Sequence, residues 1–160
     1  MYRLGHQGAS LVAYAPLGLA LLLLGQPALA AVGGAVSLGL ASLPDIDQRL
    51  PGVQHRGVTH TLAFALAVGT ALGAVGWLLG RDAGARTAAE FATVGFAVGT
   101  VAIVSHLLAD VITPMGITPF WPLSKRHYTL DVCRAENRLA NYALLGIGLA
   151  VTVAVLAVTR

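Results

Sequence analysis

Histidine and aspartate residues gather in two short stretches that follow or end apolar segments. These stretches are Asp45-Ile-Asp47 with His55-Arg56-Gly57-Val58-Thr59-His60, and His106-Leu-Leu-Ala-Asp110. Imidazole nitrogens and carboxylate oxygens bind divalent metals of the zinc or manganese kind. A bound cation is also one of the few partners that stabilises such groups beside hydrocarbon. The pattern therefore predicts a metal site at a membrane surface.

His106 and Asp110 are four residues apart within an apolar segment. In a helix this spacing places both side chains on one face, where they can bind one ion or two neighbouring ions. The alternative is a histidine hydrogen-bonded to a neighbouring helix, with Asp110 as a polar helix end. This pair alone leaves both interpretations open.

Asp45 and Asp47 follow Pro44, which ends regular helix, so their carboxylates are also candidates for a simple helix cap. Two carboxylates this close repel each other unless they are protonated or share a cation. With histidines nearby, the repulsion favours metal binding. We expect Asp45 and Asp47 to bind the metal, and one of them to orient a water molecule or to bridge two ions.

His55 and His60 are five residues apart, which is not the spacing of a helical ligand pair. We expect His60, at the start of a helix, to bind the metal directly, and His55 to bind it directly or to support a ligand. Arg56 is a candidate phosphate clamp because its planar fork matches two oxygens of an oxyanion. Its alternative roles are an anchor to lipid headgroups and a partner of Asp47. Thr59 is a candidate helix N-cap.

Three further residues join the candidates on position. His6 precedes the first apolar segment, where a histidine is usually solvated, but it lies on the same membrane face as the others and is included as a ligand. His127 and Asp131 are four apart beside Lys125 and Arg126. Such basic loops commonly lie on anionic lipid, so whether this pair joins the site stays open.

The elements that must position these residues are membrane-spanning helices. The chain is 56% hydrophobic and only 11% charged, which is typical of a polytopic membrane protein rather than a soluble one. Five apolar stretches lie at residues 9–24, 27–43, 61–80, 91–113 and 139–159. Each is close to the length that crosses about 30 Å of hydrocarbon at about 1.5 Å per residue. We predict an all-α fold, a single integral membrane domain over residues 1–160.

Small residues predict that the bundle is compact. Gly69-x-x-x-Gly73 and Gly95-x-x-x-Gly99 remove the side chains that would separate the third and fourth helices. The net charge of +3 rests on ten Lys and Arg, most of them beside apolar segments. We therefore expect contact with membrane lipids and none with nucleic acid. Cys133 is the sole cysteine, which excludes an internal disulfide and a thiolate metal cluster.

Basic residues predict the topology. With five spans, one side of the membrane carries seven Lys and Arg and the other three: Arg3, Arg49, Arg56, Lys125, Arg126, Arg134 and Arg138 against Arg81, Arg86 and Arg160. The positive-inside rule then places the N-terminus and the metal site at the cytoplasmic face of the inner (plasma) membrane. All five histidines lie at or near that face.

The start of the chain also resembles a signal peptide, because Arg3 and an apolar run precede Ala28-Leu29-Ala30 in the manner of a cleavage site. Cleavage would remove His6. The apolar sequence continues directly into a second span, which favours a retained helical hairpin.

The motifs resemble a known family. Leu43-Pro44-Asp45-Ile-Asp47, His55-Arg56-Gly57-x-Thr59-His60-Thr61 and His106-x-Leu108-Ala109-Asp110-x-x-Thr113-Pro114-x-Gly116 are similar to those of the YdjM-like membrane-bound metal-dependent hydrolases. The agreement runs from His6 to about Trp121. The resemblance implies an inner-membrane protein with a hydrolytic metal centre, and some members are described as LexA-regulated. It implies little about the substrate.

A more distant likeness is to zinc-dependent phospholipase C and the P1-type nucleases, whose helical fold holds zinc through histidines and acids. The order of His6, Asp45, His60, His106 and Asp110 follows theirs. Beyond these residues the chain offers only His127 and Asp131, so the likeness implies one or two ions rather than three. It favours phosphoesters as substrates by analogy.

Together these features predict a membrane-bound metal-dependent hydrolase that acts on a phosphoester or lipid-linked ester, with zinc as the expected metal and manganese as the alternative. Asp45, Asp47 and Arg56 are the expected catalytic residues. Two other classes remain: a metal-ion or proton transporter, and a non-catalytic scaffold stabilised by metal. Oligomeric state stays open.

Overall fold

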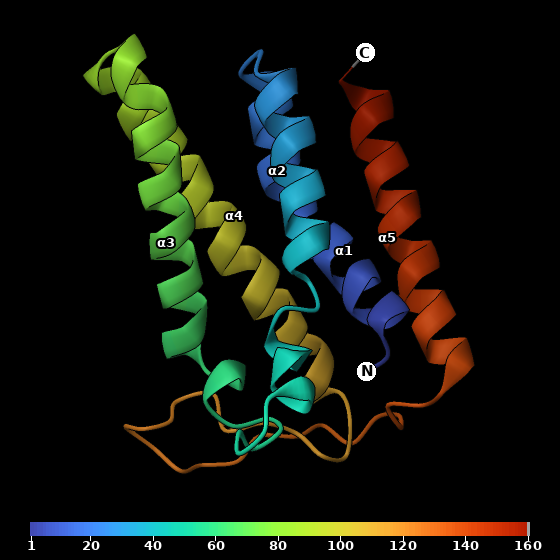
Figure 1. Cartoon of the computed structure of the whole chain (residues 1–160). Helices are drawn as coiled ribbons and strands as arrows, with labels where there is room; N and C mark the ends of the chain where they lie inside the picture. Colours follow the sequence, from blue (N-terminus) through green and yellow to red (C-terminus); the bar gives the residue numbers. More distant parts are fainter. Residues whose placement is uncertain (160) are drawn as a thin grey trace.

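The computed structural model describes residues 1–159 and is built from five long helices that stand side by side (Figure 1). They are α1 (Arg3–Leu23), α2 (Pro27–Leu40), α3 (Leu62–Gly80), α4 (Ala85–Val111) and α5 (Arg138–Val158). Three short 3-10 segments join them: η1 (Pro44–Arg49), η2 (Val58–His60) and η3 (Arg81–Ala83). Residues 1–159 contain no β-strand, only an isolated bridge between Ile117 and Tyr128. The predicted all-α fold is confirmed.

All five long helices are long and apolar enough to cross a membrane. For α2 and α3 the apolar span includes the 3-10 turn that follows the helix. Many large apolar side chains point outward, among them Leu23, Leu79 and Leu139, each at least 70% exposed. Only 11% of the most apolar stretch of α5 is buried within the protein. Outward-facing hydrocarbon on this scale is stable in contact with lipid rather than water.

Helices α3 and α4 form a closely packed hairpin. A Cβ atom added to Gly99 would lie 3.0 Å from the Cα of Gly69, and one added to Gly73 would lie 3.1 Å from the carbonyl oxygen of Ala92. Real side chains rarely tolerate such distances, so the glycines are what allow the two backbones to touch. The structure confirms the packing that the Gly-x-x-x-Gly spacings predict.

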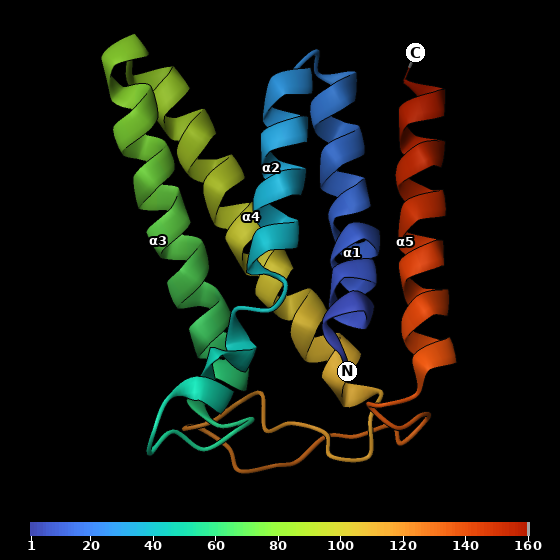
Figure 2. The ribbon, with the colours of Figure 1, turned by 45° about the vertical axis from the view of Figure 1, so that its right-hand side comes forward.

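Helix α1 is the centre of the other half of the bundle. It packs against α2, α4 and α5, whereas α5 packs chiefly against α1 (Figure 2). A Cβ atom on Gly148 would lie 2.7 Å from the carbonyl oxygen of Gly8, so α1 and α5 also meet backbone to backbone. The Ser10 and Ser37 hydroxyls share a buried 2.9 Å hydrogen bond between α1 and α2.

Helix ends differ from the predicted ones. Helices α1 and α4 each begin six residues before their apolar stretches, at Arg3 and Ala85. Apolar sequence marks the part that crosses hydrocarbon, whereas the backbone hydrogen bonds continue into polar residues. His6 therefore lies inside α1, not before it as predicted. Thr61 rather than Thr59 caps α3, accepting the Phe64 N–H at 3.1 Å.

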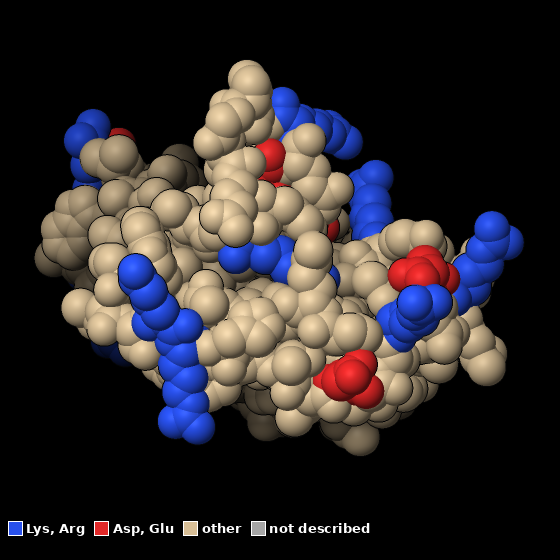
Figure 3. Space-filling view, turned by 90° about the horizontal axis from the view of Figure 1, so that it is seen from below, with Lys and Arg blue, Asp and Glu red and all other residues tan. Residues whose placement is uncertain are grey.

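Two irregular segments, residues 41–61 and 112–137, lie together at one end of the bundle beside the N-terminus (Figure 1). We call this the loop end. Backbone hydrogen bonds hold it in place: Leu62 N–H to Pro119 O at 2.8 Å, and Leu130 N–H to Val111 O at 2.7 Å. Seen from below, its surface carries Lys and Arg side chains mainly around the rim (Figure 3). Arg160, one of the three basic residues assigned to the opposite side, lies outside the described residues.

Candidate metal centre

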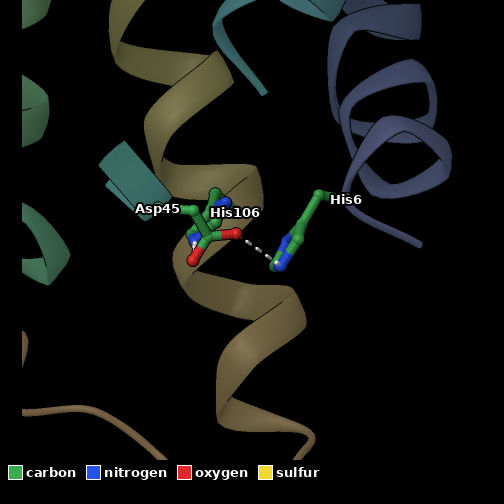
Figure 4. A group of neighbouring side chains, drawn as sticks. All are labelled: His6, Asp45 and His106. Carbon is green, nitrogen blue, oxygen red and sulfur yellow. Dashed lines mark ion pairs between the residues drawn. The ribbon is translucent and has the colours of Figure 1, made fainter. Parts of the chain in front are cut away.

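Five metal-ligand side chains from four elements converge at the loop end. His6 comes from α1, Asp45 from η1, His60 from η2, and His106 and Asp110 from α4. Four of them are buried, and only the side chain of Asp45, 23% exposed, reaches the surface. His6 and His106 point toward Asp45 from their two helices (Figure 4). Nitrogen and oxygen atoms of these residues fall into overlapping groups close enough to share an ion.

His60 Nε2, His106 Nε2 and Asp110 Oδ2 belong to one group of residues that could hold an ion, and Asp45 Oδ1 lies beside both nitrogens as a fourth atom. We call these the four-atom set. His106 Nε2 lies 3.1 Å from His60 Nε2 and 3.3 Å from Asp110 Oδ2. His60 Nε2 lies 3.4 Å from Asp110 Oδ2, and Asp45 Oδ1 lies 3.7 and 3.8 Å from the two nitrogens. Zinc bonds of about 2.0–2.1 Å in a tetrahedron separate the ligand atoms by about 3.3–3.4 Å. The separations among the two nitrogens and Asp110 Oδ2 match those of a tetrahedral zinc site, and Asp45 Oδ1 lies a few tenths of an ångström farther from the nitrogens than such a site requires.

Hydrogen bonds fix how the two histidines carry their protons. His106 Nδ1 lies 2.8 Å from the carbonyl oxygen of Ala41, which can only accept, so Nδ1 carries the proton. His60 Nδ1 lies 3.0 Å from the Thr59 hydroxyl, which donates its own proton to Asp47 Oδ2 and therefore accepts from Nδ1. Asp47 Oδ2 itself lies 3.2 Å from Nδ1. In the neutral rings both Nε2 atoms then present lone pairs to each other at 3.1 Å. Such an arrangement repels unless a cation lies between the atoms.

Asp47 supports His60 from behind. Its Oδ1 accepts from His55 Nδ1 at 2.9 Å, and its Oδ2 accepts from the Arg56 backbone N–H at 3.0 Å and from the Thr59 hydroxyl at 2.8 Å. Both oxygens are thus engaged by protein donors, and Asp47 belongs to none of the possible metal-binding groups among the described residues. These contacts suit an orienting carboxylate, and direct binding of the metal by Asp47 stays a prediction.

The side chain of Arg56 binds Asp110, whereas only its backbone N–H contacts the Asp47 carboxylate. Its Nη2 donates to Asp110 Oδ1 at 2.7 Å, and its Nη1 donates to Thr113 Oγ1 at 2.9 Å and to Gly116 O at 3.0 Å. The N-terminal nitrogen of Met1 lies 2.7 Å from the same Oδ1. Asp110 Oδ1 therefore faces cationic donors while its buried Oδ2, which has no hydrogen-bond partner, faces the imidazoles.

His6 has a different position from the other histidines. Its ring stacks on that of His106 with centroids 3.7 Å apart, and both of its nitrogens are buried without a hydrogen-bond partner. Its Nε2 lies 3.8 Å from Asp45 Oδ2 and 3.6 Å from Asp110 Oδ1. Asp45 and Asp110 thus each turn one oxygen to the four-atom set and the other toward His6. Because Asp110 Oδ1 is already engaged by Arg56 and the N-terminal nitrogen, the group that could hold an ion beside His6 is His6, Asp45 and His106.

The electrostatics of the cluster favour positive charge. Burial would lower the pKa of His60, but the carboxylates of Asp110, Asp45 and Asp47 outweigh it and raise the pKa above its ordinary value. In a metal-free protein His60 therefore attracts a proton. A divalent ion would place positive charge at the same position and bind several of the nitrogen and oxygen atoms at once.

The remaining predicted residues lie at the margin or outside. His55, 34% exposed, groups with Asp45 and His60 at the edge of the cluster. His127 and Asp131 are exposed and belong to no possible metal-binding group among residues 1–159. A pocket of about 450 Å³ at the loop end has Asp45, His55 and Arg56 among its lining residues, so the cluster is open to the surface there.

Sequence reasoning missed one supporting residue, Asn141 of α5. Its side chain is buried, accepts the Tyr2 N–H at 2.9 Å, and donates to the carbonyl oxygens of Ala135 and Asn137. It thereby ties the start of α1, and with it His6, to α5. A lone asparagine in an apolar span was the available signal.

The fold and the cluster define a class: an all-helical membrane protein with a buried group of histidines and aspartates at one end. The model of the YdjM inner membrane protein family matches residues 1–159, so the chain belongs to that family. This confirms the resemblance carried by the three motifs and places the protein in a membrane. Neither the curated proteins nor the solved structures include a match to this chain.

Proposed function

We propose that the protein is a metal-dependent hydrolase that cleaves a phosphoester at the cytoplasmic membrane face. The observation that carries the proposal is the four-atom set, in which the two histidine nitrogens lie 3.1 Å apart and 3.3–3.8 Å from the oxygens of Asp110 and Asp45. The carbonyl oxygen of Ala41 and the hydroxyl of Thr59 hold the Nδ1 atoms of the two rings. Burying such groups together is costly without a cation. Their types and spacing suit zinc, with manganese as the alternative.

The residues of the cluster have different roles in this proposal. His60, His106, Asp110 and Asp45 would hold one ion, and His6, which groups with Asp45 and His106, would help to hold a second. A bound zinc ion lowers the pKa of water and polarises a phosphoryl oxygen. Because Asp45 alone among these residues is partly exposed, water and substrate reach the cluster beside it.

Arg56 has a changed role in this proposal. Two of its nitrogens already hold Asp110, Thr113 and Gly116, and its buried Nε has no hydrogen-bond partner. It orients Asp110 and adds positive potential to the pocket wall, so it offsets charge on a phosphate without clamping it in a bidentate manner. Arg134, which lines the same pocket and is exposed, is a further basic group for an anionic substrate.

The cytoplasmic location rests on charge. The loop end carries most of the Lys and Arg residues, while Arg81 and Arg86 lie at the other end. The positive-inside rule places the richer end in the cytoplasm. Cysteine-accessibility labelling from each side of intact membrane vesicles tests this, with Lys125→Cys in a Cys133→Ser background expected to react from the cytoplasmic side.

Metal content combined with hydrolysis is the direct test. The detergent-purified protein is expected to retain one or two zinc ions per chain and to release phosphate from a phosphoester such as phosphatidic acid. His106→Ala should lose both properties. His127→Ala, an exposed histidine at the same end, is the matched control and should lose neither. A metal-free wild type, or equal metal content in both variants, would overturn the proposal.

A transporter is the rival from another class, but the cluster lies at one end of the bundle rather than at mid-membrane, where transport sites are usual. Liposome flux of zinc or protons would reveal it. A metal-stabilised scaffold has one observation in its favour, because an ion in the cluster would link α1, α4, η1 and η2. Metal would then raise the melting temperature while every hydrolysis assay stayed blank.

A further inference from the structure

A second pocket reaches Asp45 from the side of α1 and α2. Its volume is about 610 Å³, and Arg3, Arg49 and Asp45 are among its lining residues together with apolar side chains such as Leu38 and Ile46. Both arginines are exposed and neither forms an ion pair within residues 1–159. Two free guanidinium groups beside a candidate metal ligand suit an anionic group with several oxygens.

An apolar groove adjoins this pocket. It has a volume of about 410 Å³ and runs between α1, α2 and α5, with Leu11, Ala35 and Leu156 among its lining residues. Leu38 lines both the groove and the pocket, so the two are neighbours along α2. The polar end of this combined site meets Asp45, and its apolar end extends up the membrane-spanning helices.

Small residues and one aromatic ring shape the groove. The Tyr14 hydroxyl donates to Ala30 O at 2.7 Å, which fixes the ring within the groove wall. Cβ atoms added to Gly18 and Gly34 would lie 3.0 and 3.2 Å from that ring. Larger side chains at these positions would meet the Tyr14 ring, so the two glycines let the ring lie flat within the groove wall.

We propose that this combined site binds a membrane lipid phosphate, with the phosphate at Arg3 and Arg49 and one hydrocarbon chain in the α1–α2–α5 groove. The inference rests on the proposed function and names its substrate class: a lipid phosphoester that enters from the bilayer. Charge complementarity selects an anionic headgroup, and the apolar lining selects the chain. The position of Asp45 delivers the phosphoester to the cluster.

Another apolar groove provides the internal comparison. It lies between α2, α3 and α4, has a volume of about 330 Å³, and includes Val32 and Val75 among its lining residues. It shares no lining residue with the Asp45 pocket and has no charged side chain. Filling it should therefore leave binding of the lipid phosphate unchanged.

The experiment uses phosphatidic acid with a photoactivatable diazirine in one acyl chain, reconstituted with the full-length protein in phosphatidylcholine vesicles. Crosslinks mapped by mass spectrometry are expected to concentrate on residues 31–38 and 152–156. Ala35→Trp should abolish this labelling, whereas Val32→Trp, on the other flank of α2, should not. Each of Arg3→Gln and Arg49→Gln should weaken binding about fivefold, the effect of one basic contact with an anionic headgroup. Arg138→Gln, an exposed arginine outside both sites, is the control.

Labelling spread evenly over the lipid-facing helices, or labelling that Ala35→Trp does not reduce, overturns the lipid site whatever the hydrolysis assays give. The binding measurement needs no turnover, so it separates the two proposals. Concentrated labelling without phosphate release from any substrate would keep the lipid site and refute the hydrolase. Phosphate release that is equal for short-chain and long-chain phosphatidic acid, with even labelling, would do the reverse.

Discussion

The two ends of the bundle differ in whether their charged and polar side chains are buried or exposed. At the loop end, His6, His60 and His106 are fully buried and Asp110 is 1% exposed. At the other end Arg81 and Asp82 pair at 3.7 Å while remaining 61% and 93% exposed. Water stabilises the exposed pair, so the pair adds little to the stability of the fold. The buried groups have lost water and need partners from the protein or a bound ion. The difference supports the proposal that the functional site lies at the loop end.

The largest effect should come from removing the central carboxylate. Asp110→Ala leaves Arg56 buried beside no acid, and breaking a buried pair in this way costs about 3–5 kcal/mol. We expect a large drop in thermal stability in detergent and loss of bound metal. Asp82→Ala, the matched exposed acid at the other end, should melt as the wild type does. Equal melting temperatures for the two variants would show that the buried and exposed acids contribute alike, and would contradict this prediction.

A smaller effect should separate a direct ligand from an orienting one. Asp47→Asn keeps the size of the side chain but weakens its hold on the Thr59 hydroxyl, which accepts the Nδ1 proton of His60. The loss of such support typically lowers metal affinity about 10–100-fold. Titration with zinc should show weaker binding but unchanged stoichiometry at saturation. Loss of stoichiometry would instead place Asp47 in direct contact with the ion.

The smallest effect concerns pH. Because its pKa is raised in the folded protein, protonated His60 adds stability to the metal-free form at low pH, and this contribution is lost as pH rises through that pKa. Metal must displace the same proton, so metal binding should strengthen as pH rises. The zinc-dependent increase in melting temperature should therefore be larger at pH about 8 than at pH about 6. In His60→Ala the contribution of this proton should be absent; an identical pH dependence there would assign the effect to another group.

Much of the fold was predictable because lipid imposes a simple rule. Five apolar stretches gave five helices, and the glycine spacings gave the α3–α4 contact. The ends of the helices were not predictable from apolarity, as the burial of His6 inside α1 shows. Backbone hydrogen bonds continue past the apolar stretch, and nothing in the composition marks where they stop.

The types of the residues and their shared membrane face predicted which of them meet, but their geometry was predictable only where the sequence is periodic. The spacing of His106 and Asp110 gave their common face on α4. Asp45 and Asp47 could not be told apart because they lie in the 3-10 turn η1, where residues two apart point in different directions. The loop that follows depends on contacts distant in sequence. Arg56, with a positive φ of 59°, uses its backbone for Asp47 and its side chain for Asp110.

The most direct measurement is anomalous diffraction at the zinc absorption edge on crystals of the purified protein. We expect an anomalous-difference peak enclosed by His60, His106, Asp45 and Asp110, with any second peak beside His6. No peak in protein loaded with zinc, or a peak only at exposed residues such as His127, would contradict it.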